Sequence, residues 1–463
     1  MKEKINVTVL IIGAGTAATN AAREVVQSGV MDVVIVHPVS LLNTCIEEGC
    51  MPSKSVLAVA HAKESLASVE ATRNKHIVRV RSSLSDSIAD AKYTEVIGTA
   101  HFISPHEVVV VHEEQETVYR AEKIVIATGS KPHVPPIPGL DPSHPRILIS
   151  DDVVSERAHF EAVPQSVLVT GSGPIGLELA TFFHDMGTKV DVLQRGTRFL
   201  PTFDSEFGAE RYRASQDAAS FPIHTEAELN TAQPHESGVT CKVTIAGQAN
   251  EKEYEYVLVA TGRRPNIDGL NLAEAGVALD EHGVIKHDAT LRTSVPHIFI
   301  AGDVTNHHQI LHYAAEMGKI AGKNAASDSN QEMDYDRHLL AVSFDQYPSA
   351  LIGLTETQAI ERGMKVVTAT KHFNSIGLGI LKRQEYGLWK LVAEAGSGRV
   401  VGAQVVGPRE SGELVQLLTP IIWNQNTAAD IMQMTWYHPT YAEILHSLAR
   451  DICNQSGTDC PEV

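Results

Sequence analysis

The hydrophobic pattern at the start of the chain predicts a strand, a glycine-rich turn and a helix. Residues 7–12 form a continuous apolar run, and residues 13–18 read Gly-Ala-Gly-Thr-Ala-Ala. A helical pattern covers residues 19–28, and the next strand is expected over residues 33–36.

The same pattern returns later in the chain. An apolar strand over residues 167–170 leads into Gly-Ser-Gly-Pro-Ile-Gly at 171–176 and then into a helix. Each unit also has its own apolar strand that ends in Ala-Thr-Gly, at residues 127–129 and 260–262. An internal duplication of this kind predicts two dinucleotide-binding units, and so two nucleotides bound by one polypeptide.

The small residues of these turns have physical roles in such a site. Gly13 permits the tight turn, Gly15 lets the backbone approach a pyrophosphate, and Ala18 lets the helix pack on the strand. The phosphates would then lie at a helix N-terminus. The second unit has all three glycines, Gly171, Gly173 and Gly176. The alternative is a tight turn that binds no ligand.

The position that usually accepts a ribose hydroxyl departs from the pattern in both units. The strand over residues 33–36 ends in His37 in place of a carboxylate, and the second unit has Gln194 followed by Arg195 and Arg198. Two guanidinium groups without a carboxylate favour the 2′-phosphate of NADP over NAD. The alternative is that both arginines face solvent. A further apolar strand ends in Asp303, which can hold a ribitol or ribose hydroxyl.

From about residue 335 the pattern changes to alternating strands. These are expected over residues 341–345, 365–372, 387–393 and 400–406, followed by a helical stretch over 411–424. A final helix is expected to end near residue 451. A mixed sheet with helices and no nucleotide motif predicts an oligomerisation domain.

Composition and charge restrict the possible partners. The chain has 463 residues, enough for roughly three domains, and a net charge of −18. That charge argues against nucleic acid and anionic membrane surfaces as partners. Neither a membrane-spanning run nor a signal peptide is visible. Five cysteines in so long a chain fit a reducing cytoplasm.

The candidate chemistry lies in the stretch from Cys45 to Lys54. Cys45 and Cys50 are five positions apart, and Pro-Ser-Lys at 52–54 is expected to open a helix over about residues 55–68. A thiol near a helix N-terminus and a lysine is a thiolate candidate. Two such thiols can cycle between dithiol and disulfide. No second Cys/His pair with ligand spacing follows, so zinc is not expected.

Taken together, these motifs resemble the flavoprotein disulfide reductase family over essentially the whole chain. The motifs are the two dinucleotide units, the Cys45–Lys54 stretch, and His-Pro-Thr-Tyr-Ala-Glu at 438–443. Among members such as glutathione reductase and mercuric reductase, the chain looks closest to dihydrolipoamide dehydrogenase. The resemblance implies an α/β fold like that of glutathione reductase. It would contain an FAD domain (1–150 and, centrally, 269–336), an NAD(P) domain (151–268) and an α+β dimerisation domain (337–463).

The resemblance also implies roles for individual residues. Cys50 would face the flavin and Cys45 would exchange with the substrate disulfide. Lys54 would pair with Glu178, and His438, oriented by Glu443, would act as acid/base in the partner subunit of a homodimer. The residues implied for FAD are Gly13, Gly15, Ala18, His37, Thr44, Lys54, Ala127, Thr128, Gly129, Asp303 and Leu311; those for the nicotinamide cofactor are Gly171, Gly173, Gly176, Gln194, Arg195, Arg198 and Gly262.

Several departures leave the substrate open. Leu42-Asn43 stand where relatives usually have Gly-Gly, and Gln194 conflicts with the NAD preference of dihydrolipoamide dehydrogenase. A lipoyl-type dithiol is the substrate that the resemblance favours. The alternatives are an NADPH-dependent reductase of a disulfide, a metal ion or a quinone, and a non-catalytic flavin-binding scaffold. Cys453 and Cys460 are expected after the last helix, as a thiol pair on a mobile tail.

Overall fold

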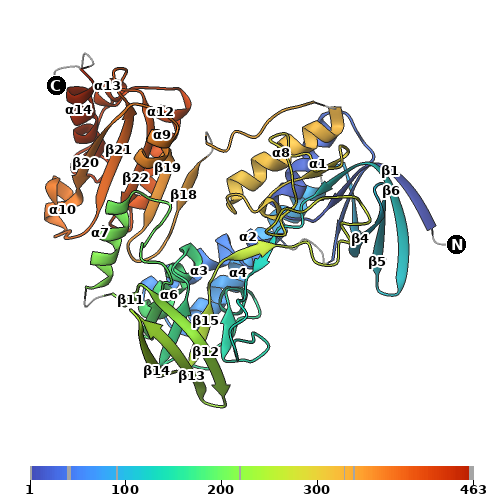
Figure 1. Ribbon diagram of the computed structural model, residues 1–463, viewed down its shortest axis with the longest axis horizontal. Helices are drawn as coiled ribbons and strands as arrows, with labels where there is room; N and C mark the ends of the chain where they lie inside the picture. Colours follow the sequence, from blue (N-terminus) through green and yellow to red (C-terminus); the bar gives the residue numbers. More distant parts are fainter. Residues whose placement is uncertain are drawn as a thin grey trace.

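The computed structural model describes residues 3–38, 43–89, 92–217, 220–327, 329–336 and 339–457. Figure 1 shows three groups of elements: the sheet that contains the N-terminal strand, the sheet around β15, and a C-terminal sheet at the opposite end from the N-terminus. None of the helices in the described ranges is long and apolar enough to cross a membrane.

The first sheet has a parallel core with an antiparallel extension. Its strands, in order, are β3 (Thr94–Ile97), β2 (Val33–His37), β1 (Glu3–Ile12), β6 (Gln115–Ile126), β5 (Glu107–His112) and β4 (Thr99–Ser104), and β17 (Ile298–Ile300) pairs with β6. Ile12 lies opposite both Val36 and Ile126, and Ile126 lies opposite Ile300. The strand ends that precede Gly13 and Ala127 therefore meet at one edge, where ligands bind in parallel α/β sheets.

Small residues let two helices that accompany this sheet pack closely against each other. They are α1 (Thr16–Gln27) and α8 (Leu311–Ser327). A Cβ atom at Gly318 would lie 2.3 Å from the carbonyl oxygen of Ala17, and one at Gly322 would lie 2.4 Å from that of Ala21. Only glycine allows this approach, so the helix pair is set by the spacing of small side chains.

The second sheet repeats the first. Its parallel strands, in order, are β11 (Ile223–His224), β10 (Lys189–Leu193), β9 (Ser166–Thr170), β15 (Tyr256–Val259) and β8 (Ile147–Ile149), with helices α5 (Asp151–Val154) and α6 (Pro174–Asp185). Thr170 lies opposite both Leu193 and Val259, so Gly171, Gln194 and Ala260 share one edge. An antiparallel sheet adjoins it, made of β12 (Ala227–His235), β13 (Gly238–Ile245) and β14 (Gln248–Tyr254). Strands β7 (Ser130–Pro132) and β16 (Arg263–Pro265) pair after the two Ala-Thr-Gly segments.

The C-terminal sheet is antiparallel and has its own core. Its order is β18 (Leu340–Val342), β19 (Ser349–Gly353), β22 (Val400–Val406), β21 (Leu388–Glu394) and β20 (Val366–His372). Trp389 and Leu391 on β21 pack in one buried cluster with Leu448 and Ile452 of the last helix. The remaining elements are α9 (Glu356–Glu361), η2 (Phe373–Ser375), α10 (Gly377–Leu381), α11 (Ser411–Leu414), η3 (Val415–Leu418), α12 (Thr419–Trp423), α13 (Ala428–Met432) and α14 (Ile444–Ser456).

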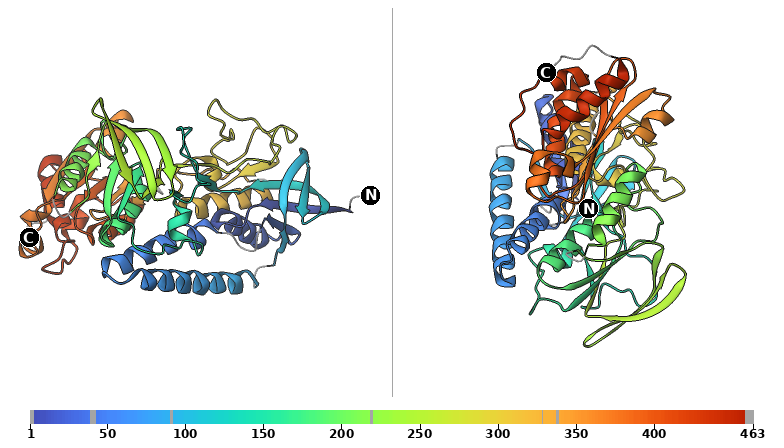
Figure 2. Two further views of the ribbon diagram at one scale, coloured as in Figure 1. Left: turned by 90° about the horizontal axis from the view of Figure 1, so that it is seen from below. Right: turned by 90° about the vertical axis from the view of Figure 1, so that its left-hand side faces the viewer.

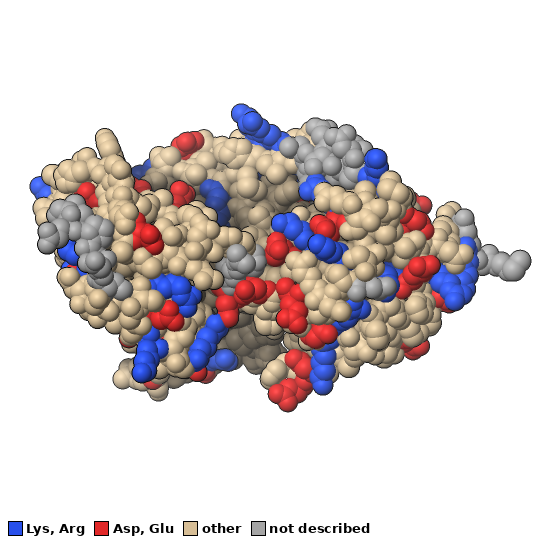
Figure 3. All heavy atoms as spheres, turned by 90° about the horizontal axis from the view of Figure 1, so that it is seen from above, with Lys and Arg blue, Asp and Glu red and all other residues tan. Residues whose placement is uncertain are grey.

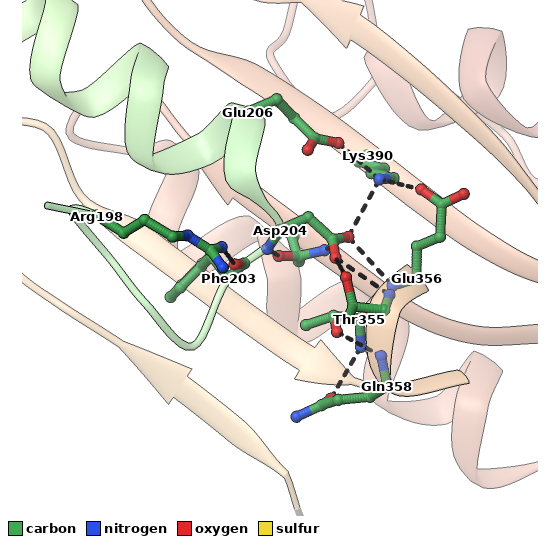
Figure 4. Close-up of polar contacts among 10 residues, drawn as sticks. Arg198, Phe203, Asp204, Glu206, Thr355, Glu356, Gln358 and Lys390 are labelled. Atoms are coloured by element: carbon green, nitrogen blue, oxygen red, sulfur yellow. Dashed lines mark hydrogen bonds and ion pairs between the residues drawn. The ribbon is translucent and has the colours of Figure 1, made fainter. Parts of the chain in front are cut away.

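A buried lysine joins the second nucleotide unit to the C-terminal sheet (Figure 4). Lys390 on β21 is 3% exposed, and its ammonium lies 3.1 Å from Asp204, 2.6 Å from Glu206 and 2.5 Å from Glu356. Asp204 precedes α7 (Ser205–Ser215) and also accepts the backbone N–H of Glu356 at the start of α9. Burial alone would lower the pKa of Lys390, but the bonds to these carboxylates outweigh burial and raise it. Desolvated charges joined in this way hold the two units in one orientation.

Two sequence expectations about helix ends were wrong. The helix of the cysteine stretch, α3 (Cys50–His61), begins at Cys50 and not after Pro52. Proline is tolerated there because first-turn N–H groups have no partner within the helix. The last helix runs to Ser456, so Cys453 lies inside it, 2% exposed and disulfide-bonded, and not on a tail beyond it. Cys460 lies outside the described residues.

The first long helical hairpin follows the cysteine stretch. Helix α4 (Leu66–Ala89) follows α3 along the chain, and Figure 2 shows it extending along one side of the molecule. On the face shown in Figure 3, basic and acidic side chains of the described residues are interspersed. The described residues form no broad basic surface on this face of the kind that nucleic acid requires.

Candidate active site

Cys45 is the second residue of the short helix α2 (Thr44–Glu47), and Cys50 is the first residue of α3, after a tight turn. The Asn43 side chain accepts the backbone N–H of Cys45 at 3.0 Å and donates to the Thr16 hydroxyl at 3.4 Å. It therefore ties the cysteine turn to the first glycine-rich turn. A Cβ atom at Gly49 would lie 2.7 Å from the carbonyl oxygen of Thr44, so glycine lets this turn close. Leu42 lies outside the described residues.

The arrangement distinguishes the two thiols chemically. A hydrogen bond from the Cys45 thiol, helped by the Lys54 ammonium, outweighs burial and lowers the pKa of Cys50 to about 7. The same hydrogen bond, together with burial, raises the pKa of Cys45. Near neutral pH Cys50 is therefore the thiolate, and Cys45 is the thiol that donates to it.

Three segments far apart in sequence meet beside Cys50. Lys54 lies one turn along α3 and pairs with Glu178 of α6 at 2.8 Å. Glu178 also accepts the backbone N–H of Phe344 at 3.1 Å, and the ring centre of Phe344 lies 4.7 Å from the Lys54 ammonium. Sequence reasoning had proposed the Lys54–Glu178 pair, and the structure brings those two side chains together. Sequence reasoning missed Phe344, because this residue belongs to no recognisable motif.

The glycine positions of the first unit fit an FAD molecule. A Cβ atom at Gly13 would lie 2.1 Å from the carbonyl oxygen of Ala127, whereas one at Gly15 would meet nothing within 4 Å, so the helix start is open to a phosphate. The buried side-chain atoms without a hydrogen-bond partner among the described residues include the Thr128 hydroxyl and the Gln309 nitrogen. Buried polar groups are normally satisfied, so these two are suited to a bound polar ligand.

Asp303 lies at the same edge of the sheet, just after β17. The Ser130 hydroxyl donates to it at 2.9 Å, and Arg263 donates in turn to that hydroxyl oxygen at 2.8 Å. Burial raises the pKa of Asp303, and Ser130 and Arg263 oppose that rise. The carboxylate therefore lies in a partly buried position with one oxygen held by the protein, as a hydroxyl-binding aspartate requires. The sequence analysis gave Arg263 no role; its place directly after the second Ala-Thr-Gly segment is the signal that could have identified it.

The other residues expected at FAD occupy varied positions. His37 ends β2 and is 2% exposed, Ala18 is fully buried under the sheet, and Thr44 begins α2. Gly129 has a positive φ of 71° and open space at its Cβ position. Leu311 is the first residue of α8, and its side chain is exposed.

The second unit has the same glycine-rich turn, but the residue that follows its second strand is Gln194. A Cβ atom at Gly171 would lie 2.3 Å from the Ala260 carbonyl oxygen, one at Gly176 would lie 2.0 Å from the Gly171 oxygen, and Gly173 and Gly262 are open. The Gln194 side chain accepts the Ser172 hydroxyl at 2.5 Å. The turn therefore fits a second dinucleotide phosphate.

The two arginines near this edge differ in their surroundings. Both are exposed, and Arg198 donates to the backbone oxygen of Phe203 at 3.0 Å (Figure 4). Arg198 therefore already holds the loop that leads to Asp204. Arg195 is the arginine whose charge is directed to solvent near Gln194.

The histidine expected as acid/base belongs to the C-terminal part of the chain. His438 Nδ1 lies 2.8 Å from Glu443 Oε2, and the His438 side chain is 74% exposed. The segment that holds it lies between α13 and α14, and Figure 1 shows these helices at one end of the molecule, with α2 and α3 near the middle. The histidine–glutamate pair and the cysteine pair are therefore each formed, but one chain does not bring them together.

Comparison with known proteins agrees with this arrangement. The family described as pyridine nucleotide-disulphide oxidoreductase matches residues 7–318, and its dimerisation domain matches residues 340–449. Dihydrolipoyl dehydrogenase of Bacillus subtilis is 30% identical over 457 residues, 95% of each chain, and that of Chlamydia trachomatis is 31% identical over 453 residues, 94% of each chain. The solved structure of the HOCl-induced flavoprotein disulfide reductase RclA from Escherichia coli, a Cu(II) complex, superposes with a TM-score of 0.85 at 24% identity, over 97% of this chain and 99% of that one.

The chain belongs to the pyridine nucleotide-disulphide oxidoreductase family. It is an FAD-dependent disulfide oxidoreductase with the glutathione-reductase-like fold, as its motifs indicated. The family implies FAD and a pyridine nucleotide as cofactors, and the two glycine-rich edges described above fit both.

Proposed function

We propose that this enzyme exchanges electrons between a pyridine nucleotide and a lipoyl-type dithiol through the Cys45–Cys50 pair. The observation that carries the proposal is the asymmetry of the pair, in which Cys45 donates a hydrogen bond to Cys50 beside Lys54. The length and continuity of the match to dihydrolipoyl dehydrogenases, 94–95% of the chain, support the substrate class. The small number of cysteines supports a reducing cytoplasm as its location.

The residues divide the reaction between them. FAD, when bound, carries the electron pair between Cys50 and the pyridine nucleotide. One substrate thiolate attacks the Cys45 sulfur, the Cys45–Cys50 bond breaks, and Cys50 leaves as the thiolate that Lys54 stabilises. The second substrate thiolate then attacks the substrate sulfur bound to Cys45, which closes the substrate disulfide and releases Cys45. Of the two substrate protons, one ends on Cys45 and one on His438 Nε2, because Glu443 occupies Nδ1.

A homodimer would supply the histidine to the cysteine pair. Large apolar side chains are exposed in the C-terminal part of the chain, including Tyr437 at 79%, Leu381 at 72% and Ile380 at 64%. Exposed apolar side chains around a catalytic pair are typical of an interface between subunits. The family match to a dimerisation domain supports the same arrangement.

The substrate class is tested by steady-state assays of the purified holoenzyme. We expect the highest kcat/KM with dihydrolipoamide and an oxidised pyridine nucleotide. Both thiols of dihydrolipoamide belong to one molecule, so they can react with the cysteine pair one after the other. Glutathione disulfide, Hg(II) and a quinone, each with NADPH, serve as competing acceptors. Faster turnover of any of these acceptors than of the lipoyl substrate would replace this proposal with an NADPH-dependent reductase.

We propose NADP(H) as the preferred nucleotide, on the charge of Arg195 and the neutral side chain of Gln194. Gln194→Glu would place a carboxylate at the end of β10, where it accepts ribose hydroxyls and repels a 2′-phosphate. We expect the ratio of kcat/KM for NADPH over NADH to fall by about tenfold, equivalent to one charge-assisted hydrogen bond.

Gln233→Glu is the matched control for this prediction, because it adds the same charge on the exposed face of β12. It should leave the ratio unchanged. An unmodified enzyme that already prefers NADH several-fold would show that the arginines near Gln194 are simply solvated.

A further inference from the structure

A loop of the C-terminal sheet reaches the redox centre. Residues 343–348 connect β18 and β19, and two of their backbone N–H groups bond to helix α6 of the second nucleotide unit. Phe344 donates to Glu178 at 3.1 Å, and Gln346 donates to the Thr181 hydroxyl at 3.0 Å. The loop is therefore docked on the helix that carries the partner of Lys54.

A buried ion pair fixes the same loop from the other side. Asp345 and Arg211 of α7 are both fully buried and lie 3.2 Å apart. Asp345 also accepts the Ser343 hydroxyl at 3.0 Å and the backbone N–H of Tyr347 at 2.8 Å. A desolvated pair with these additional bonds holds one loop conformation, so the position of Phe344 is determined by the fold.

We propose that Phe344 is a positioning residue for the redox centre, whose ring confines the Lys54 ammonium while its backbone N–H holds Glu178. This inference rests on the proposed role of Cys50 as the thiolate. An aromatic ring attracts an ammonium through its quadrupole and excludes water from one side of it. The Lys54 side chain is 37% exposed, so water can reach the ammonium on the side that Glu178 and the Phe344 ring leave open.

The charges around Cys50 set the expected direction. The groups that act on it are Cys45 on α2, Lys54 on α3 and Glu178 on α6; Cys45 and Lys54 favour the thiolate, and Glu178 opposes it. Without the ring, the ammonium can turn toward solvent, where water screens it. The thiolate then loses part of its stabilisation, and a higher pH is needed to form it.

The test is a pH titration of the long-wavelength band that the Cys50 thiolate gives with bound flavin in the two-electron-reduced holoenzyme. In Phe344→Leu we expect the midpoint to rise by about half a pH unit, the size of one cation–π contact. Phe344→Tyr keeps a ring and should restore the wild-type midpoint. Tyr256→Leu removes a comparable ring from Arg146, 4.8 Å away, in a different part of the second unit, and should leave the midpoint unchanged.

A second measurement separates this inference from the proposed function. The pH dependence of Cys50 alkylation by iodoacetamide, followed by mass spectrometry of the reduced protein, reports the thiol without the flavin band. If the wild-type band is missing, the role of Cys50 beside the flavin is wrong, and alkylation still decides the role of Phe344. An identical midpoint in wild type and Phe344→Leu overturns the inference; Phe344→Met gives the same reading if the leucine variant does not fold.

Discussion

Replacing Cys50 with serine removes disulfide turnover and the long-wavelength band together. Serine cannot form the disulfide with Cys45, and its hydroxyl is not ionised near neutral pH, so neither electron transfer nor thiolate contact with flavin remains. Loss of a reacting nucleophile typically lowers kcat by on the order of 10⁴-fold or more. Anaerobic reduction followed by absorbance, together with steady-state assays on dihydrolipoamide, measures both effects.

Cys45→Ser is the matched control for this result. It also stops turnover, but the serine hydroxyl can still donate to Cys50, and the band should therefore survive. In wild type the band should fade as the pH falls through about 7, because the Cys50 thiolate becomes protonated below its pKa. A Cys50→Ser enzyme that keeps wild-type activity would falsify the assignment of the redox pair.

His438→Ala has the second largest expected effect. Removal of a positioned general acid/base slows turnover by roughly 10²–10⁴-fold. The loss should be confined to thiol substrates, because reduction of an artificial electron acceptor by the pyridine nucleotide needs no proton transfer at the cysteines. Glu443→Gln should cost less than His438→Ala, since it leaves the imidazole in place and weakens only the bond to Nδ1. Equal losses with both kinds of acceptor would indicate a folding role.

Subunit complementation shows where this histidine acts. A heterodimer of one Cys50→Ser chain and one His438→Ala chain, purified with two different tags, contains one intact site if the histidine serves the partner. We expect it to regain about half of the wild-type rate per dimer, although each homodimer is inactive. If the histidine served its own chain, both sites would be defective and the heterodimer would also be inactive. Light scattering on the wild type should show a dimer.

The glycine-rich turns were predictable because the spacing of their small residues is a short motif, although the groups that require glycine are distant in sequence. A side chain at Gly13 would meet the Ala127 carbonyl, and one at Gly171 would meet the Ala260 carbonyl. The strand segments directly before these turns, residues 9–12 and 167–170, are continuous apolar runs because they are buried on both faces. The antiparallel strands β12–β14 were not predicted. The last of them, β14, is mostly exposed and has no apolar run.

Within the site, local patterns located the chemistry but not its surroundings. Cys45 and Cys50 were recognised by their spacing and by the lysine that follows. The role of Asn43 was missed, because a side chain in a glycine position was read only as a departure, whereas it bonds to both Cys45 and Thr16. The burial of Cys453 in α14 was missed because its helix continues past the last strongly apolar residues.

The sequence by itself determined the two nucleotide turns, the redox pair and the order of the units, since each is marked by a short motif of closely spaced residues. Only the tertiary structure decided how Lys54 and Glu178 are held beside that pair, and it added Phe344 to them. Lys54 and Glu178 are 124 residues apart in sequence, and Glu178 and Phe344 are 166 apart. Such contacts depend on how whole units dock, through Lys390 with Asp204 and through the 343–348 loop, and docking leaves no periodic pattern along the chain.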